Sequence, residues 1–280
     1  MKLRSNTLGE RLVRLSLVLP FLEHVEAVGI DTQSAFSDLA LKRSDAQDPD
    51  VVVHSEVVYG LINTLASLAR DPFLGCHVGE RFDLRSWPPL SKMFEEHTTL
   101  GDFFTGWITS VPEHASSVKH ELLIGAEEAV YKTQRPNAPT NSPGQTDGFG
   151  CALIFRVIDL AEGVSWRPGN IRVGTMHPEA FPPAYKGAYI VESDTYGLEI
   201  SFPVGWLRAR LSVQTQTMNQ EKPIANGGVS LISAVRGSIQ RLLPDRDITV
   251  ENVANTLGLE KSRLKRALTK GGTNVSNELR

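Results

Sequence analysis

A chain of 280 residues with 41% hydrophobic and 22% charged residues can form one large or two ordinary globular domains, and this composition excludes collagen-like, disordered and disulfide-stapled proteins. The net charge of −3 is unevenly spread: residues 230–280 hold nine basic and five acidic residues, a net of +4, whereas the rest carries −7. A basic C-terminal segment on an acidic body is typical of a nucleic-acid-binding module, although such an excess also arises by chance.

The N-terminal segment resembles a signal peptide only superficially. Pro20 interrupts its apolar patch at residues 15–22, and no small-residue cleavage site follows, so we predict a surface helix from a cap at Thr7 to Leu22. No apolar run approaches the roughly 20 residues that a membrane-spanning helix needs. Cys76 and Cys151 are isolated thiols. We therefore expect a cytoplasmic protein without membrane contact and with two inert, buried cysteines.

The next part of the chain shows two kinds of periodicity. Apolar residues at helical spacing predict helices over residues 33–41, 55–71, 100–111 and 149–160. Alternating or β-branched runs predict strands over residues 121–124, 129–133, 170–176, 188–192 and 198–202. The first two strands flank Gly125 as a hairpin, and the Pro- and Asn-rich residues 135–148 are a predicted loop. Helices followed by helix mixed with antiparallel sheet indicate an α+β domain.

A polar segment without periodicity, residues 214–228, ends in Asn-Gly-Gly and is the best linker candidate. It divides the chain into an α+β domain at residues 1–213 and an all-α segment at residues 229–280.

Three helices are predicted in the all-α segment. The first runs over residues 231–243 and ends at Pro244; the second starts after Thr249, a good N-cap, and ends at Gly258. The third covers residues 260–270. A short Gly-containing turn between two short helices is the signature of a helix-turn-helix, whose second helix enters the major groove of DNA.

The third helix has one apolar side, formed by Leu264, Ala267 and Leu268, that would pack on the second helix. Its other side offers guanidinium, ammonium and hydroxyl groups, which bind phosphates and guanine edges. The predicted DNA-binding residues are Lys261, Ser262, Arg263, Lys265, Arg266, Thr269 and Lys270. The alternative is a small helical bundle with a solvated basic face.

The pattern of this segment resembles the first helix-turn-helix of the AraC/XylS family of transcription regulators. The resemblance lies in Thr249-x-x-x-Val253-Ala254-x-x-Leu257-Gly258-Leu259, in Ser262-Arg263-Leu264-Lys265-Arg266-x-Leu268 and in Gly272-Thr273. Upstream, Asp71-Pro72-x-Leu74-Gly75-x-x-x-Gly79-Glu80 and residues 181–202 resemble the N-terminal effector-binding domain of one branch, the arabinose-binding type. The resemblance implies that residues 1–213 are an effector-sensing and dimerisation domain and that residues 229–280 bind DNA. The partners it implies are double-stranded DNA, an unidentified small-molecule effector and a second copy in a homodimer.

The family's DNA-binding module holds two helix-turn-helix units joined by a long helix. Here residues 275–280 resemble the start of that joining helix, and the given sequence stops at Arg280. We therefore expect only the first unit and, because it makes fewer phosphate and base contacts, weaker DNA binding.

An effector site needs an apolar cavity with a few polar groups. Aromatic residues with one histidine as polar handle are the predicted lining, although the same residues also suit a core; they are Phe94, His97, Phe103, Phe104 and Trp107. The seven histidines lack metal-ligand spacing, and no nucleophile elbow, P-loop or dinucleotide motif is present. We therefore predict no catalytic residues, no metal and no cofactor.

Two hypotheses remain open. In the first, the protein is an effector-responsive DNA-binding regulator. In the second, it is a ligand-binding or dimerising module with a vestigial helix-turn-helix, which would show no preference for any DNA sequence.

Overall fold

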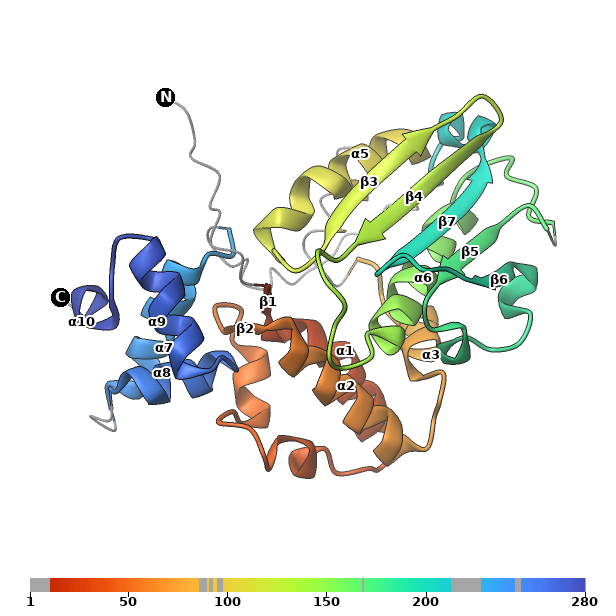
Figure 1. Ribbon diagram of the computed structural model, residues 1–280. Coiled ribbons are helices and arrows are strands. Elements are labelled where there is room, and N and C mark those ends of the chain that lie inside the picture. The colour runs from red at the N-terminus through yellow and green to blue at the C-terminus, as the bar shows by residue number, and fades with distance from the viewer. Residues whose placement is uncertain are drawn as a thin grey trace.

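The computed structural model describes residues 11–85, 90, 93–94, 98–167, 169–212, 228–244 and 248–279. It is a mixed α+β molecule: helices and a five-stranded sheet form its larger part, and the C-terminal helices gather at one end (Figure 1). Among the described helices, none combines the length and apolar character needed to cross a bilayer. The predicted linker lies almost wholly outside the described residues.

The described part of the chain begins with a two-stranded ribbon, where a helix had been predicted. Strand β1, Leu12–Arg14, pairs antiparallel with β2, Val52–His54. A 3-10 turn follows, and α1 covers Leu19–Ala27 with Pro20 in its first turn. Because proline lacks an N–H, it fits at the start of a helix and not inside one. The prediction of a continuous helix to Leu22 was therefore wrong over residues 12–18, and Thr7 lies outside the described residues.

The predicted helix at residues 33–41 is a single 3-10 turn, Gln33–Phe36. Side chains compete for the local backbone here: Asp31 Oδ1 accepts from the Gln33 N–H at 3.0 Å, and Ser37 Oγ donates to the Ser34 carbonyl at 2.8 Å. A second 3-10 turn spans Arg43–Gln47.

The longer predicted helices are confirmed. Helix α2 covers Ser55–Ala69 and ends at Arg70 in the left-handed conformation (φ 51°). Helix α3, Leu74–Arg81, was not among the predicted helices. Helix α5 covers Leu100–Ser110 and α6 covers Gly144–Asp159. Helix α6 thus begins inside the predicted loop 135–148. Its first residues are glycine and polar, so their composition concealed a helical start.

Two glycines allow α3 and α6 to pack at very short range. A Cβ on Gly75 would lie 1.9 Å from the Gln145 carbonyl oxygen, and one on Gly79 would lie 2.6 Å from Ala152 Cβ. The glycines noticed in the sequence motif around Asp71 therefore set the contact between these helices.

The main sheet has the order β3-β4-β7-β5-β6. Its strands are β3 Lys119–Ile124, β4 Glu128–Gln134, β5 Arg172–Thr175, β6 Tyr189–Glu192 and β7 Leu198–Pro203. Alternate residues of β4 and β7 are buried, as expected for a sheet with one covered face. All pairings are antiparallel except that of β5 with β6, which is parallel. The all-antiparallel expectation was wrong there, because the connection from 176 to 188 returns the chain to the same end of the sheet.

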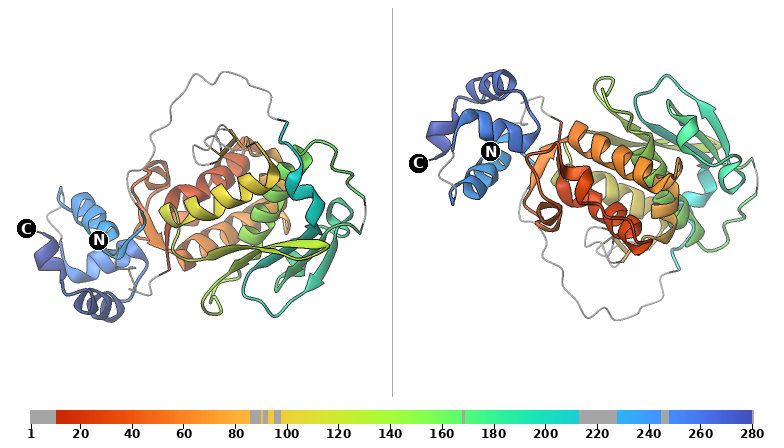
Figure 2. Two further views of the ribbon diagram at one scale, coloured as in Figure 1. Left: turned by 90° about the horizontal axis from the view of Figure 1, so that it is seen from above. Right: turned by 90° about the horizontal axis from the view of Figure 1, so that it is seen from below.

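Helices α5 and α6 pack against the sheet, α2 packs on α6, and α1 packs on α2 and α3, all around one large apolar core (Figure 2). The C-terminal helices have their own core. They are α7 Leu231–Leu242, α8 Val250–Leu257, α9 Lys261–Lys270 and α10 Val275–Glu278. The predicted helices of this segment are thus confirmed.

Candidate functional site

The α8–α9 pair is built from local signals that the sequence carries. Thr249 Oγ1 accepts a hydrogen bond from the Asn252 N–H at 3.0 Å and caps α8. Gly258 has φ +67°, a conformation that favours glycine, and the Leu259 N–H donates to the Ala254 carbonyl at 2.9 Å. Helix α8 therefore ends at Leu257, and α9 begins at Lys261 after a three-residue turn.

Helix α9 is strongly two-sided. Leu264 and Leu268 are 0% and 1% exposed and anchor the helix in the C-terminal core. The opposite side presents a stripe at helical spacing, made by the exposed residues Ser262, Lys265, Arg266 and Thr269. This stripe, called the α9 stripe below, combines two cations with two hydroxyl groups.

The other predicted DNA-binding residues lie at the ends and flank of α9. Lys261 is exposed and forms an ion pair with Glu251 at 3.0 Å, and Lys270 is exposed in the last turn. Arg263 differs, because it is half-buried and its charge acts on His54 of the N-terminal part. Six of the seven predicted residues are therefore exposed and one is not.

The aromatic residues predicted to line an effector site are packed against one another. Phe103 and Phe104 are 1% and 0% exposed. Phe94 stacks on Phe103 at 5.3 Å between ring centroids, and Phe104 stacks on Phe202 at 5.6 Å. These three side chains lie in the main core. His97 lies outside the described residues. Ligand binding by this set remains a prediction.

Trp107 belongs to a polar chain at the edge of that aromatic cluster. Its Nε1–H donates to the Tyr131 hydroxyl at 2.8 Å, and His120 Nδ1 lies 2.5 Å from the same oxygen. Burial, followed by the charge of Arg135, lowers the pKa of His120 to about 4. At neutral pH the His120 ring is therefore uncharged. Trp107, Tyr131 and His120 form a hydrogen-bonded network without a formal charge.

Two open clefts flank α2. One, called the α2–α6 cleft below, has a volume of about 480 Å³ and lies where the end of α2 meets the starts of α3 and α6. Its lining is mostly polar: Asn63, Ala66, Ser67, Arg70, Asp71, Pro72, Ser142, Gly144, Gln145, Glu179 and Ala180. The other, of about 620 Å³, lies between α2 and the 3-10 turn at residues 33–36. Neither is lined by the predicted aromatic set.

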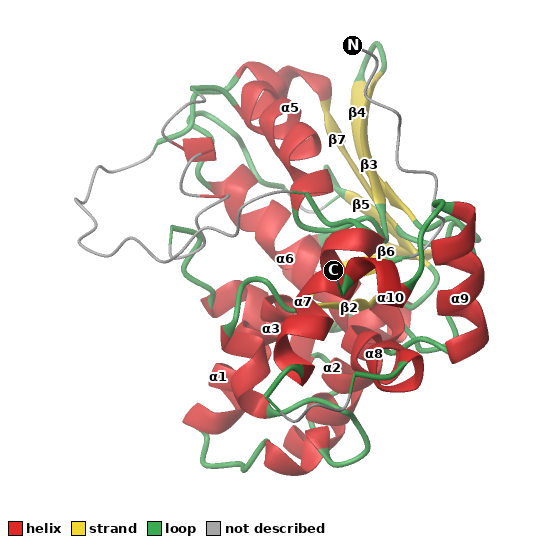
Figure 3. Cartoon of the chain, turned by 90° about the vertical axis from the view of Figure 1, so that its left-hand side faces the viewer, coloured by secondary structure: helices red, strands yellow, loops and turns green. Residues whose placement is uncertain are grey.

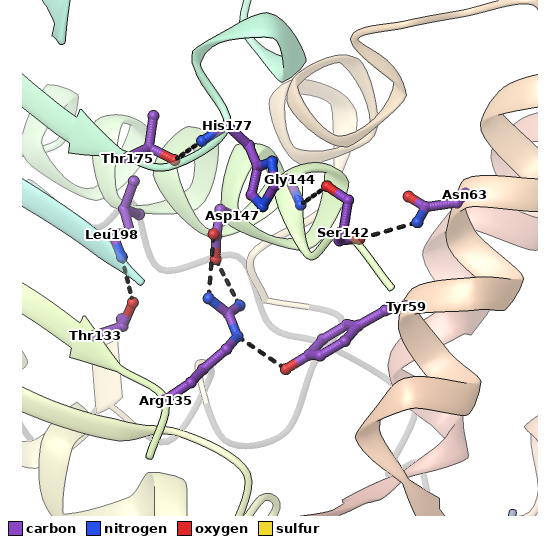
Figure 4. Close-up of polar contacts among 10 residues, drawn as sticks. All are labelled: Tyr59, Asn63, Thr133, Arg135, Ser142, Gly144, Asp147, Thr175, His177 and Leu198. Atoms are coloured by element: carbon purple, nitrogen blue, oxygen red, sulfur yellow. Dashed lines mark hydrogen bonds and ion pairs between the residues drawn. The ribbon is translucent and has the colours of Figure 1, made fainter. Parts of the chain in front are cut away.

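A buried ion pair lies next to the elements that form the α2–α6 cleft (Figure 4). Arg135 donates to both carboxylate oxygens of Asp147 at 2.7 and 3.2 Å, and its Nε–H donates to the Tyr59 hydroxyl at 3.0 Å. Burial alone would lower the pKa of Arg135, but Asp147 and Tyr59 more than offset it, so the pKa is raised overall. The network joins α2, the end of β4 and α6. Sequence reasoning missed it, because nothing marks one charged residue in a polar segment as the partner of another 12 residues away.

Neither metal nor thiol chemistry has a built site in the described ranges. Within them, no three His, Cys, Asp or Glu side chains are grouped to hold a metal ion. Cys76 and Cys151 are both buried. Burial raises the pKa of Cys76 to about 12 and raises that of Cys151 as well. Both thiols are therefore protonated at neutral pH and weakly nucleophilic.

No curated protein matches the chain significantly. Among solved structures, the transcriptional regulator CdpR from Pseudomonas aeruginosa is similar at 12% identity and a TM-score of 0.47, over 94% of this chain and 82% of that one. Those values are too low to bear on function. The family model for the arabinose-binding N-terminal domain of AraC transcription regulators matches residues 29–189, more than half of the 280 residues. The protein therefore belongs to the AraC family of transcription regulators, in the branch with an arabinose-binding-type N-terminal domain.

Proposed function

We propose that the protein is a DNA-binding regulator in which the α8–α9 pair acts as a helix-turn-helix and α9 reads the major groove. The observation that carries the proposal is the α9 stripe: Lys265, Arg266 and two hydroxyl residues are exposed on a helix whose opposite side is locked in the C-terminal core. A rigid backing is what a reading helix needs, since base contacts depend on side chains held at a fixed place.

The chemistry of the stripe matches a duplex. An arginine guanidinium donates two parallel hydrogen bonds to guanine O6 and N7, and lysine and hydroxyl groups bind phosphate oxygens. Each neutralised phosphate releases counterions, so binding must weaken as salt rises.

The test is salt-dependent binding of the full chain to a library of duplexes. Arg266→Ala should weaken binding about tenfold and relax base preference, and Lys265→Ala should reduce the salt slope by about one. Arg167→Ala, an exposed arginine of the N-terminal part, is the matched control and should change neither. Equal affinities for the Arg266 and Arg167 variants would contradict the proposal. Binding without any sequence preference would favour a module with a vestigial helix-turn-helix.

The N-terminal part, residues 1–213, is proposed to bind a small-molecule effector. Its family match and the two clefts along α2 support this role. Thermal shifts of the full chain with a panel of small metabolites, L-arabinose included, test it. Loss of a shift in Trp107→Phe would place the ligand at the aromatic set, and loss in Asn63→Leu would place it in the α2–α6 cleft. No shift with any compound of a broad panel would oppose effector binding.

Three further assignments are part of this proposal. Residues 214–228 connect the sensing part to residues 229–280 as a linker, the regulator acts in the cytoplasm, and it pairs as a homodimer through the sensing part. Analytical ultracentrifugation of the full chain tests the last assignment, since a monomer at micromolar concentration would contradict it.

A further inference from the structure

The C-terminal helices are seated on the N-terminal part along one continuous contact, called the seam below. Leu12 of β1 and Val52 of β2 are 1% and 5% exposed, and they belong to the apolar core of α7–α9 instead of the main core. Figure 3 views the molecule from this end, with β2 directly behind α7 and α8. Side chains from the first strands thus complete the core of the C-terminal helices.

The turn between α8 and α9 closes the seam against the start of α2. A Cβ on Gly258 would lie 2.2 Å from Val57 Cγ2 and 3.9 Å from His54 Cβ. The turn backbone therefore lies directly against the Val57 side chain, and a Cβ at position 258 would require the turn or Val57 to shift. Gly258 serves the seam as well as the left-handed turn.

Helix α7 adds a second contact to the seam. A Cβ on Gly237 would lie 3.7 Å from the Asp50 carbonyl oxygen, which is ordinary packing distance. Arg241 of α7 is half-buried there. Burial lowers the pKa of its guanidinium, and the charges of Asp45 and Asp48 oppose that shift. Helix α7 and the α8–α9 turn of the C-terminal segment thus both contact residues 45–57.

The seam leaves polar atoms without hydrogen bonds. His54 and Ser55 are 2% and 1% exposed, and among the described residues His54 Nε2 and Ser55 Oγ have no hydrogen-bond partner. His54 Nδ1 accepts from the Glu56 N–H at 3.3 Å, so the neutral ring carries its proton on Nε2. A buried N–H without a protein partner is unfavourable, whereas opening the seam would expose it to solvent. These unpaired groups make the free energy of closing the seam less favourable than that of forming an entirely apolar contact.

Arg263 lies near the seam and is not part of the exposed α9 stripe. It is half-buried, and after burial itself its charge is the largest influence that lowers the pKa of His54 to about 4. It therefore lies close to residues 45–57, which contact the α8–α9 turn.

We propose that the seam is a reversible joint that holds the α8–α9 pair in one orientation when closed and frees it when open, with Arg263 as a positioning residue. Helix α2 starts at the seam, and its later residues line both clefts. It is thus the element that connects an occupied cleft to α9. The joint stands on its own geometry, while its use in regulation rests on the proposed function.

Amide hydrogen exchange of the full chain tests the joint without DNA. Gly258→Ala adds a Cβ against Val57, so exchange over residues 52–57 should become at least fivefold faster. Gly272→Ala is the control, because it has the same left-handed backbone (φ +76°) and nothing within 4 Å of its Cβ. It should leave residues 52–57 unchanged. Val57→Ala in the Gly258→Ala background should restore protection, since it removes the methyl group in the way.

Equal exchange over residues 52–57 in the Gly258 and Gly272 variants would overturn the joint. So would a loss of protection that Val57→Ala fails to restore, because that loss would come from unfolding of the turn alone.

The role of Arg263 has its own readout. Arg263→Ala should speed exchange over residues 52–57 and reduce duplex affinity less than Arg266→Ala does. Unchanged exchange together with an affinity loss equal to that of Arg266→Ala would make Arg263 a DNA contact and overturn its assignment. If the wild-type chain binds no duplex, the proposed function fails, while the exchange data still decide the joint.

Discussion

Arg135 and Asp147 face each other inside the N-terminal part, with side chains only 4% and 6% exposed and hydrogen bonds of 2.7 and 3.2 Å between them. The Tyr59 hydroxyl accepts the remaining Nε–H of the guanidinium. The pair ties the start of α6 to α2 and to the end of β4, so it sets the geometry of the α2–α6 cleft.

Breaking this pair should be costly. Asp147→Asn leaves the Arg135 charge buried without a counter-ion, and we expect a loss of about 3–5 kcal/mol in the free energy of unfolding. The measurement is urea unfolding at pH 7. Glu251→Gln, the same change in the exposed ion pair with Lys261, is the control and should cost about 0–1 kcal/mol. Similar losses in both variants would show that burial does not strengthen the first pair.

The α3–α6 contact predicts opposite effects for alanine at different glycines. Gly75→Ala would place its Cβ 1.9 Å from a backbone oxygen and should destabilise the protein by at least about 2 kcal/mol. Gly150 lies on α6, and a Cβ there has nothing within 4 Å, so Gly150→Ala should stabilise the protein by about 0.5–1 kcal/mol through helix propensity. Thermal unfolding of both variants measures this. A tolerated alanine at Gly75 would mean that the two helices are farther apart than described here.

The cap of α8 gives a local prediction. Thr249→Ala removes the oxygen that accepts the hydrogen bond from the Asn252 N–H. The free energy of unfolding of the C-terminal helices should therefore fall by about 1 kcal/mol. Amide exchange in α8 is the readout. Thr249→Ser keeps the acceptor and should exchange like the wild type, whereas equal exchange in the Ala and Ser variants would argue against the cap.

The buried imidazole of His54 predicts acid sensitivity. Its folded pKa of about 4 lies below the ordinary value of about 6.5, so the unfolded chain binds the proton first as pH falls. The stability that the neutral ring contributes is complete above pH 6.5 and is lost between pH 6.5 and 4, up to about 3 kcal/mol. Arg263, Arg11 and Glu56 are the charged groups around it.

His54→Asn keeps a capping acceptor for α2 and removes the titrating ring. The stability of this variant should fall less steeply than that of the wild type between pH 6.5 and 4 and run parallel to it above pH 7. Urea midpoints across this range provide the comparison, which cancels the carboxylates common to both proteins. Parallel curves below pH 6.5 would mean that His54 is not buried in solution.

Local signals alone were enough for most helices and for the chemistry of α9. The spacing of Leu264 and Leu268, the Thr249 cap and the Gly258 stop act within one or two turns, so the sequence determined the α8–α9 pair and its exposed stripe. The same reasoning failed where distant segments compete. Residues 12–14 have a helical pattern but pair with residues 52–54, because strand pairing outweighs weak local propensity.

The sequence by itself determined the family, the mixed α+β class and the basic face of α9, because these depend on composition, periodicity and short motifs. Tertiary structure alone decided that the predicted aromatic residues pack into a core, that Arg135 meets Asp147 and that the charge of Arg263 acts on His54. Each of these outcomes brings together segments separated along the chain. No local pattern encodes such a meeting, since it depends on how whole helices and strands bury their apolar sides together.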